Sequence, residues 1–202
     1  MHEPLKEDFF TALHSAGRGE FKDRGSKFLG FAFPVQTVEE SKEKLDQLKK
    51  EFHDARHHCF AYRINPEDPQ IRANDDGEPN NSAGMPIFNQ IQSCEVWNVM
   101  VVVVRYFGGT KLGVSGLINA YKNAAALALD NAVKRTVYIT ETIRIRFPYK
   151  LTNDIMRLIK DHELDIVGED MKADAGYTLG VRKSKAREVM DRIESYHEVV
   201  IL

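Results

Sequence analysis

The most constraining feature of the sequence is an apolar run in the middle of the chain, at residues 98–107. It reads NVMVVVVRYF, and no polar residue interrupts its valines. A strand with one face in water alternates apolar and polar residues, so an unbroken run predicts a strand that is buried on both faces. Its apolar part, residues 99–104, is far too short to cross a bilayer, and we expect no membrane association.

The composition is that of a folded protein without a dominant charge. Of 202 residues, 43% are hydrophobic and 29% are charged, and the formal net charge is −2. These values exclude global disorder and weigh against a tight nucleic-acid binder held by charge alone. Cys59 and Cys94 have no zinc-ligand spacing and make no disulfide scaffold. Because residues 1–20 also lack an apolar signal core, we expect a cytoplasmic protein with reduced thiols.

The first part of the chain mixes predicted strands and helices. Thr37 and Glu40 have the spacing of a capping box, which predicts the start of a helix. Phe60, Tyr62 and Ile64 alternate, as on one face of a strand. The predicted order is strand 28–35, helix 37–52, strand 55–64, a polar loop at 65–84, a short helix from Pro86, strand 98–107, a glycine turn at 108–116 and helix 117–133.

The second part of the chain is more regular. Ile143, Ile145 and Phe147 alternate with arginines, which predicts a strand with one buried face. The predicted order is strand 142–148, a helix at 151–159, strands 164–171 and 177–181, a helix capped by Ser184 and strand 199–202. This β-α-β-β-α-β order is that of a ferredoxin-like domain. We predict an α+β protein with domains at residues 1–137 and 138–202, meeting near 134–140.

The glycine turn is a candidate anion site. Gly108, Gly109, Gly113 and Gly116 separate the buried strand from a helix, and Lys111 lies among them. Main-chain amides at a helix N-terminus bind phosphate and other anions. The spacing matches neither common phosphate-loop motif, so the alternative is a tight turn in which glycine permits positive φ and close packing.

An acidic turn is the second candidate. Asp75, Asp76 and Glu78 lie around Gly77 in the sequence DDGEP. Three carboxylates could hold a hard cation or serve in acid–base catalysis. The alternative is a turn in which aspartate side chains accept hydrogen bonds from nearby amides.

His57, His58 and Cys59 form the third candidate. On a strand, His57 and Cys59 share a face and could bind a metal with a third ligand from the acidic turn, or Cys59 could act as a nucleophile. The alternative is hydrogen-bonded histidines and a small buried thiol. We favour this alternative and predict neither a metal nor a cofactor.

Arg105 connects these candidates, because an arginine at the end of a buried strand requires an anionic partner. The acidic turn could supply that partner. We therefore expect one concave site. Its predicted residues are His57, His58, Asp75, Asp76, Glu78, Arg105, Tyr106, Gly108, Gly109, Lys111, Gly113 and Gly116.

The sheet of the second domain offers a basic face. Arg144, Arg146 and Arg182 should lie with Thr178 on the face that the helices leave open. Together with Lys111 they are the predicted phosphate contacts of a nucleic acid. The face lacks the aromatic pair with which an RNA-recognition motif stacks bases, and its alternative is a solvated surface.

Taken together, the motifs resemble the YigZ/IMPACT family over nearly the whole chain. They are SKF at 26–28, DARHHC at 54–59, DDGEP at 75–79, AG at 83–84 with Pro86, VVVRYFGG at 102–109, LG at 112–113, GL at 116–117 and AY at 120–121. The resemblance implies a first domain like the second domain of ribosomal protein S-five and a second domain like the last domain of elongation factor G.

The resemblance also implies a functional class. Eukaryotic relatives regulate translation through an additional N-terminal domain that this sequence does not contain, whereas bacterial members resemble nucleic-acid-binding or translation regulators without established catalytic residues. We expect a non-catalytic regulator that associates with RNA, the ribosome or a translation protein. The alternative is an enzyme that acts on a phosphorylated or metal-bound small molecule between the acidic turn and the glycine turn.

Overall fold

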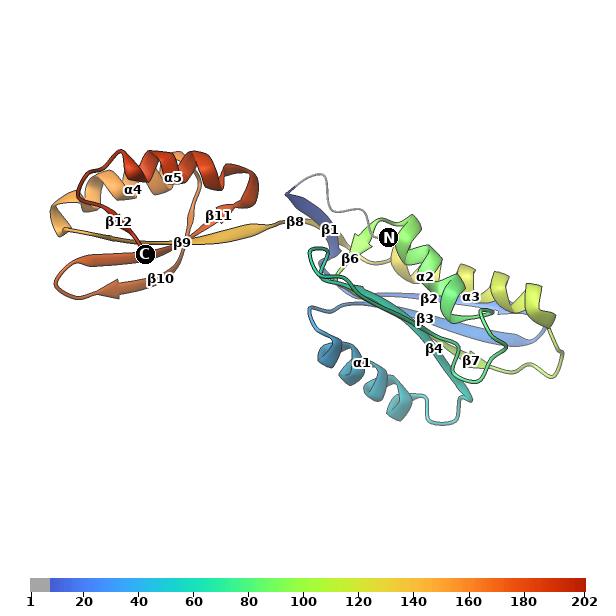
Figure 1. The fold of residues 1–202 in the computed structure, drawn as a ribbon. Coiled ribbons are helices and arrows are strands. Elements are labelled where there is room, and N and C mark those ends of the chain that lie inside the picture. The colour runs from blue at the N-terminus through green and yellow to red at the C-terminus, as the bar shows by residue number, and fades with distance from the viewer. Residues whose placement is uncertain (1–7) are drawn as a thin grey trace. The chain divides into compact units, whose positions relative to one another are not determined.

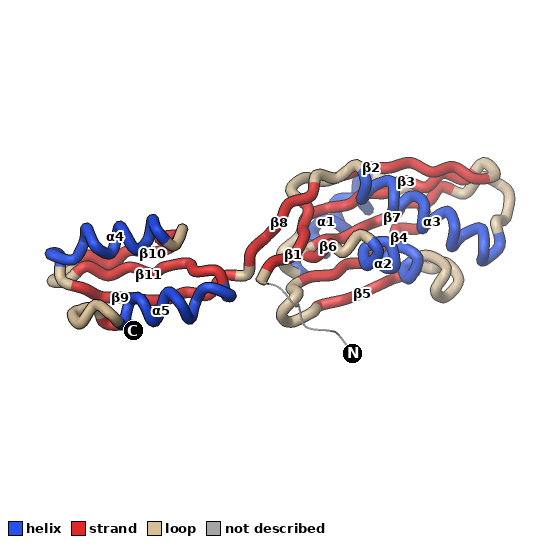
Figure 2. Tube along the Cα trace, turned by 90° about the horizontal axis from the view of Figure 1, so that it is seen from above, coloured by secondary structure: helices blue, strands red, loops and turns tan. Residues whose placement is uncertain are grey.

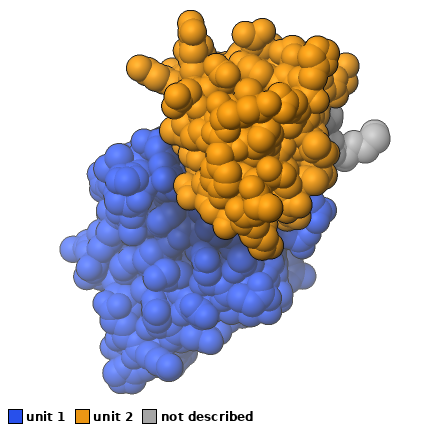
Figure 3. Space-filling view, turned by 90° about the vertical axis from the view of Figure 1, so that its left-hand side faces the viewer, with its two compact units in different colours: residues 1–5, 10–137 blue, residues 6–9, 138–202 orange. Residues whose placement is uncertain are grey.

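The computed structural model describes residues 8–202. They divide into two compact units, shown in different colours in Figure 3. The first unit comprises residues 10–137, and the second comprises Asp8, Phe9 and residues 138–202. Both contain helices and strands, so the predicted α+β class is confirmed. No helix among the described residues is long and apolar enough to cross a membrane.

The first unit is built on an antiparallel five-stranded sheet with the order β2-β3-β7-β4-β5 (Figure 2). The predicted valine strand is β7 (Val99–Tyr106), which lies in the centre. Its neighbours are β3 (Ser26–Pro34) and β4 (His57–Ile64). The outer strands are β2 (Gly17–Asp23) and β5 (Gln70–Asn74).

Helices cover both faces of this sheet (Figure 1). Helix α1 (Val38–Glu51) packs on one face, and helices α2 (Gly84–Ser93) and α3 (Gly113–Asp130) pack on the other. Alternate valines of β7 serve the two cores: Val103 belongs to the α2–α3 side and Val102 to the α1 side. The predicted burial on both faces is therefore confirmed, with every residue of β7 except the last one buried.

Glycines allow the backbone to approach closely at two places. A Cβ on Gly30 in β3 would lie 2.2 Å from the carbonyl oxygen of Ala124, so α3 rests directly on the strand. A Cβ on Gly108 would lie 1.9 Å from the carbonyl carbon of Gly25. This contact fixes the direction in which the chain leaves β7, toward the start of α3.

A small sheet with the order β6-β1-β8 completes the first unit. Its strands are β1 (Phe9–Leu13), β6 (Val96–Trp97) and β8 (Lys134–Tyr138). Strand β8 occupies most of the predicted junction at 134–140.

The second unit has the predicted ferredoxin-like order. Its sheet runs β10-β11-β9-β12, and α4 and α5 cover one face. The elements are β9 (Thr140–Phe147), α4 (Thr152–Asp161), β10 (Asp165–Met171), β11 (Ala175–Arg182), α5 (Ala186–Glu194) and β12 (Val200–Ile201). Short 3-10 turns at Tyr149–Leu151 and Lys183–Lys185 precede the two helices.

Ser184 does not cap α5, contrary to the prediction. The helix begins at Ala186 without a side-chain cap. The Ser184 hydroxyl instead donates to the Asp8 carboxylate at 2.5 Å, and Arg182 donates to both oxygens of that carboxylate. The Arg182 guanidinium and the Ser184 hydroxyl hold the pKa of Asp8 well below its usual range.

Three other predicted boundaries are wrong. Residues 65–84 are not a continuous loop, because β5 lies within them and pairs with β4. Helix α3 begins at Gly113 rather than at residue 117. Strands β1 and β2 lie before residue 28, where the predicted order contains no element.

We propose that the two units are independently folding domains, since each has its own apolar cluster. A fragment of residues 138–202 should unfold cooperatively when followed by far-ultraviolet circular dichroism during urea titration. Its stability should be low, because a domain of this size buries a small core and the fragment lacks Asp8. A gradual loss of ellipticity without a cooperative transition would contradict the proposal.

Candidate functional site

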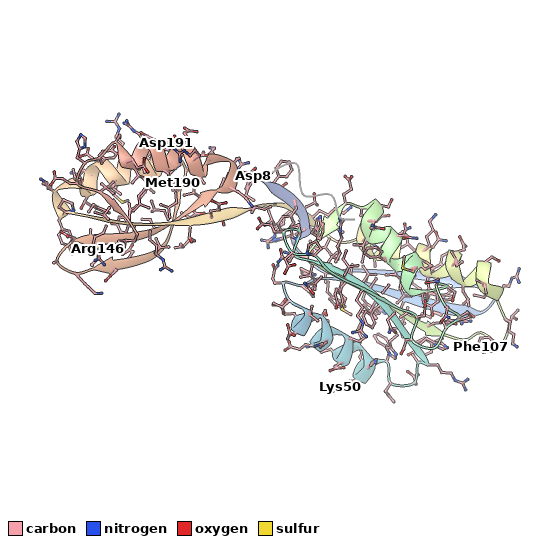
Figure 4. The ribbon with its side chains drawn as sticks, viewed as in Figure 1. Asp8, Lys50, Phe107, Arg146, Met190 and Asp191 are labelled. Carbon is pink, nitrogen blue, oxygen red and sulfur yellow. The ribbon has the colours of Figure 1, made fainter. Side chains whose placement is uncertain are left out.

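A cleft of about 820 Å³ opens on the first unit where β7 ends and α3 begins. Phe107, which follows β7, projects from this end of the unit (Figure 4) and is 56% exposed. Four segments line the cleft. They contribute Asp54, Ala55, Arg56 and His57; Glu78 and Pro79; Arg105, Tyr106 and Phe107; and Lys111, Leu112, Gly113, Val114 and Leu117.

A buried ion pair forms the inner wall of the cleft. Arg105 Nη1 donates to Glu78 Oε1 at 2.5 Å, and both side chains are more than nine-tenths buried. The Tyr121 hydroxyl donates to the same carboxylate oxygen at 2.8 Å. This chain of contacts joins the end of β7, the acidic turn and α3. Because removing one partner would leave a buried charge, the three groups stabilise one another.

The Arg105 guanidinium is held between two aromatic rings. Its central carbon lies 5.5 Å from the centroid of the Phe28 ring and 5.7 Å from that of Phe107. Its Nε, in contrast, is buried and has no hydrogen-bond partner among residues 8–202. The pair with Glu78 therefore leaves one donor of this side chain unsatisfied.

The two aspartates of the acidic turn are structural and do not line the cleft. Asp75 Oδ1 accepts hydrogen bonds from the amides of Ala83 and Gly84, at the start of α2. Asp76 Oδ2 accepts from the amide of His58 at 2.6 Å. Because both carboxylates are committed to main-chain donors, they act as a helix cap and a strand clamp.

The two histidines have separate environments. His57 lines the cleft, and its Nδ1 donates to the carbonyl of Asp76 at 2.8 Å, so of its two ring nitrogens only Nε2 could act as an acceptor. His58 is 5% exposed, belongs to neither the cleft nor its rim, and has a buried Nε2 without a partner in the described chain. Burial lowers the pKa of His58.

Cys59 is a buried thiol in the core. Its Sγ donates to the carbonyl of Asp75 at 2.9 Å and lies 3.3 Å from the Tyr121 hydroxyl. Burial raises the pKa of the Cys59 thiol, so it does not present a thiolate nucleophile. Within residues 8–202, no group of three His, Cys, Asp or Glu side chains is arranged to hold a metal ion.

At the mouth of the cleft the carboxylate is hydrogen-bonded, whereas the cationic side chains have no ion-pair partner among the described residues. The Tyr106 hydroxyl donates to Asp54 at 2.7 Å, which lowers the pKa of Asp54 and raises that of Tyr106. Arg56 and Lys111 are exposed and form no ion pair with any described carboxylate. The cationic side chains of the mouth are thus free to meet a ligand.

The glycines of the turn divide by role. The Gly108 amide donates to the hydroxyl of Ser26 at 3.1 Å, beside the close contact with Gly25. Gly109 and Gly113 have φ angles of +87° and +71°, with open space where a Cβ would lie. Gly116 packs on Leu112 inside the first turns of α3. Of the four, Gly113 lines the cleft.

The predicted basic face of the second unit has less unpaired positive charge than its sequence suggests. Arg144 lies opposite Thr178 on the sheet, and Arg146 lies on the face away from α4 and α5 (Figure 4). Arg146 is 3.5 Å from Asp170, however, and Arg182 is bound to Asp8. Arg144 alone has no carboxylate partner among the described residues.

Sequence reasoning missed several residues of the cleft as site candidates. They are Asp54, Ala55, Arg56, Pro79, Phe107, Leu112, Val114 and Leu117, with Tyr121 behind them. One signal was available: Phe107 is a large apolar residue placed directly before two glycines, outside the buried strand. Tyr121 gave no such signal, because a tyrosine in an alanine-rich helix is most simply a core residue.

The buried hydroxyl of Tyr121 should contribute more to stability than the exposed hydroxyl of Tyr106. Both donate to a carboxylate, but only Tyr121 does so in the core. We expect Tyr121→Phe to lower the free energy of unfolding by about 1.5–3 kcal/mol and Tyr106→Phe by about 0.5 kcal/mol or less. Urea titration followed by Trp97 fluorescence measures this, because Trp97 is the single tryptophan and lies in the first unit. Equal losses for the two variants would contradict the proposed role of Tyr121.

His58 should make the first unit sensitive to acid. Its pKa is lowered in the folded state, so the unfolded chain binds a proton first as the pH falls below about 6.5. Stability should therefore be constant above that pH and decrease below it. In urea titrations from pH 7.5 to 5, His58→Gln should reduce this decrease, whereas the control His57→Gln should retain it. An unchanged pH dependence in His58→Gln would contradict the assignment.

The chain is similar to known proteins over most of its length. Residues 24–129 match the family described as Impact N-terminal domain. The IMPACT family member YvyE of Bacillus subtilis is 37% identical over 63% of this chain, an alignment that spans 58% of YvyE. The IMPACT family member YigZ of Escherichia coli is 30% identical over 85% of this chain and 85% of its own.

Comparison with solved structures gives two further matches, of which the first bears on the fold. A crystal structure of a hypothetical protein has a TM-score of 0.72, with 24% identity, and covers 96% of this chain and 97% of its own, so it shares the fold. The structure described as that of the two-domain translational regulator Yih1 is 27% identical over 64% of this chain and 49% of its own, with a TM-score of 0.37. With the family match and the relatives above, the chain belongs to the IMPACT family.

Proposed function

We propose that this protein is a regulator of translation that binds RNA in the cleft of its first unit and has no turnover of its own. The chain belongs to the IMPACT family, in which translational regulators occur, and this supports a role in the regulation of translation. The side chains that line the cleft support RNA as the ligand. RNA here means a single-stranded segment, free or within the ribosome, because a cleft of this size admits an unpaired base but not a duplex.

One observation carries the proposal. The cleft presents Arg56 and Lys111 without ion-pair partners among residues 8–202, while both of its carboxylates accept hydrogen bonds from the protein itself. Glu78 is paired with Arg105, so Arg56 and Lys111 outnumber the single remaining anion, Asp54, and the mouth carries a net positive charge. Cationic side chains that line a groove attract the phosphates of a nucleic-acid backbone.

Phe107 adds a feature that suits a base. Phe107 is more than half exposed and lines the same cleft as these cations, although it follows a buried strand. An exposed aromatic ring next to positive charge is the combination by which proteins hold unpaired nucleotides, because every base stacks on such a ring. The near-neutral total charge of the chain is consistent with weak, salt-sensitive binding.

The enzymatic alternative has less support from the same geometry. A general base requires a free carboxylate or imidazole in reach of substrate. Glu78 is held by Arg105 and Tyr121, and Asp54 by Tyr106. His57 Nε2 is the remaining acceptor of this kind among the described residues that line the cleft.

A binding titration on single-stranded RNA over a salt series tests the proposal. Arg56→Ala/Lys111→Ala should weaken binding and reduce the slope of log K against log salt by about 1.4, since each phosphate contact contributes about 0.7 for a single strand. Arg144→Ala/Arg146→Ala is the matched control on the second unit and should change both quantities less.

Three results would count against it. Undetectable binding at low salt would overturn the RNA ligand. A larger loss in Arg144→Ala/Arg146→Ala than in Arg56→Ala/Lys111→Ala would move the site to the second unit. Turnover of a phosphorylated compound that the cleft variants abolish would favour the enzyme.

A further inference from the structure

We propose that the N-terminus of α3 is a phosphate-binding subsite within the cleft, formed by the first amides of the helix together with Arg105 and Lys111. This inference rests on the proposed function, because it names the part of the ligand that the cleft recognises. It goes further by placing the phosphate at the start of α3 and by naming the groups that donate hydrogen bonds to it.

The start of α3 presents unsatisfied amides. The helix spans 18 residues, its N-cap position Leu112 makes no side-chain hydrogen bond, and its first turn contains no acidic residue. The first amides of a helix have no partner within the helix and lie at its positive end. Leu112, Gly113 and Val114 all line the cleft, so the start of the helix lies at its wall.

The backbone at this point has the form of an anion-binding concavity. Leu112 has right-handed helical angles, with φ −84° and ψ −20°, and Gly113 follows with φ +71°. Successive residues of this right-handed and left-handed type turn their amides toward a common point. A Cβ on Gly113 would meet nothing within 4 Å, so the space in front of the backbone is open.

Arg105 provides an independent observation. This side chain lines the same cleft and is 7% exposed, and its Nε has no hydrogen-bond partner in the described part of the chain. Glu78 engages Nη1 and holds the guanidinium in place. A buried donor without an acceptor destabilises the fold. We infer that a ligand supplies the acceptor oxygen for Arg105.

A phosphate group matches this set of donors. It carries negative charge and several acceptor oxygens, which suit main-chain amides, a guanidinium and an ammonium group together. Lys111, exposed on the turn before α3, supplies the ammonium. Phe107 borders the same space, so the base attached to such a phosphate could lie on its ring. The phosphate could belong to a mononucleotide or to an RNA strand.

The test is an NMR titration of the full chain with three probes: inorganic phosphate, adenosine 5′-monophosphate and a short single-stranded RNA. We expect each to shift the amide signals of residues 113–115. Lys111→Gln should weaken phosphate binding roughly threefold. The control Lys122→Gln removes an exposed charge from α3 itself, outside the cleft lining, and should bind as the wild type does.

The outcomes separate this inference from the proposed function. Shifts at 113–115 with phosphate and the mononucleotide but no binding of RNA would support the subsite and overturn the RNA ligand. RNA binding that leaves these amides unshifted would overturn the subsite alone. Equal weakening by Lys111→Gln and Lys122→Gln, or shifts spread over exposed lysines, would show a nonspecific charge effect and also overturn the subsite.

Discussion

The buried pair of Arg105 and Glu78 is the interaction on which the cleft depends. Arg105 is the last buried residue of a strand whose preceding side chains are all apolar, so its charge needs a partner inside the protein. Glu78 provides it and brings the acidic turn against the end of the sheet. Asp75 then caps α2, and Asp76 holds the first residues of β4. One charge in the core thus orders an otherwise polar loop.

This use of carboxylates has a consequence for function. The acidic groups near the cleft are bound to the protein's own donors, whereas Arg56 and Lys111 at the mouth are not paired with any described carboxylate. Folding therefore pairs Glu78 with a cation, while Asp54 keeps its charge and is outnumbered by Arg56 and Lys111. On our proposal, a chain with a net charge of −2 carries a local cationic site for phosphate, although its composition weighs against a nucleic-acid binder held by charge alone.

The sequence predicts well where a single physical pattern dominates. The valine run predicts that both faces of β7 are buried, and the alternation around Ile145 predicts that one face of β9 is buried. Both predictions need only the local sequence. Strand β5 was missed because it is an exposed edge strand, QIRAN, held by main-chain bonds to β4 that leave no periodic pattern. The start of α3 was misplaced because Gly116 favours a turn locally, whereas its close contact with Leu112 requires a glycine inside the helix. The role of the acidic turn could not be predicted from the sequence. An aspartate such as Asp75 can cap a helix or bind a ligand, and its residue type is the same in both cases.

The most direct test of the cleft as the RNA site is photo-crosslinking. A single-stranded RNA that carries 4-thiouridine should be irradiated in complex with the protein, and the cross-linked peptides identified by mass spectrometry. The cleft predicts cross-links to the peptide that contains Phe107, which has the exposed ring beside the free cations. Cross-links confined to the peptides of β9 and β11, with none at Phe107, would contradict it.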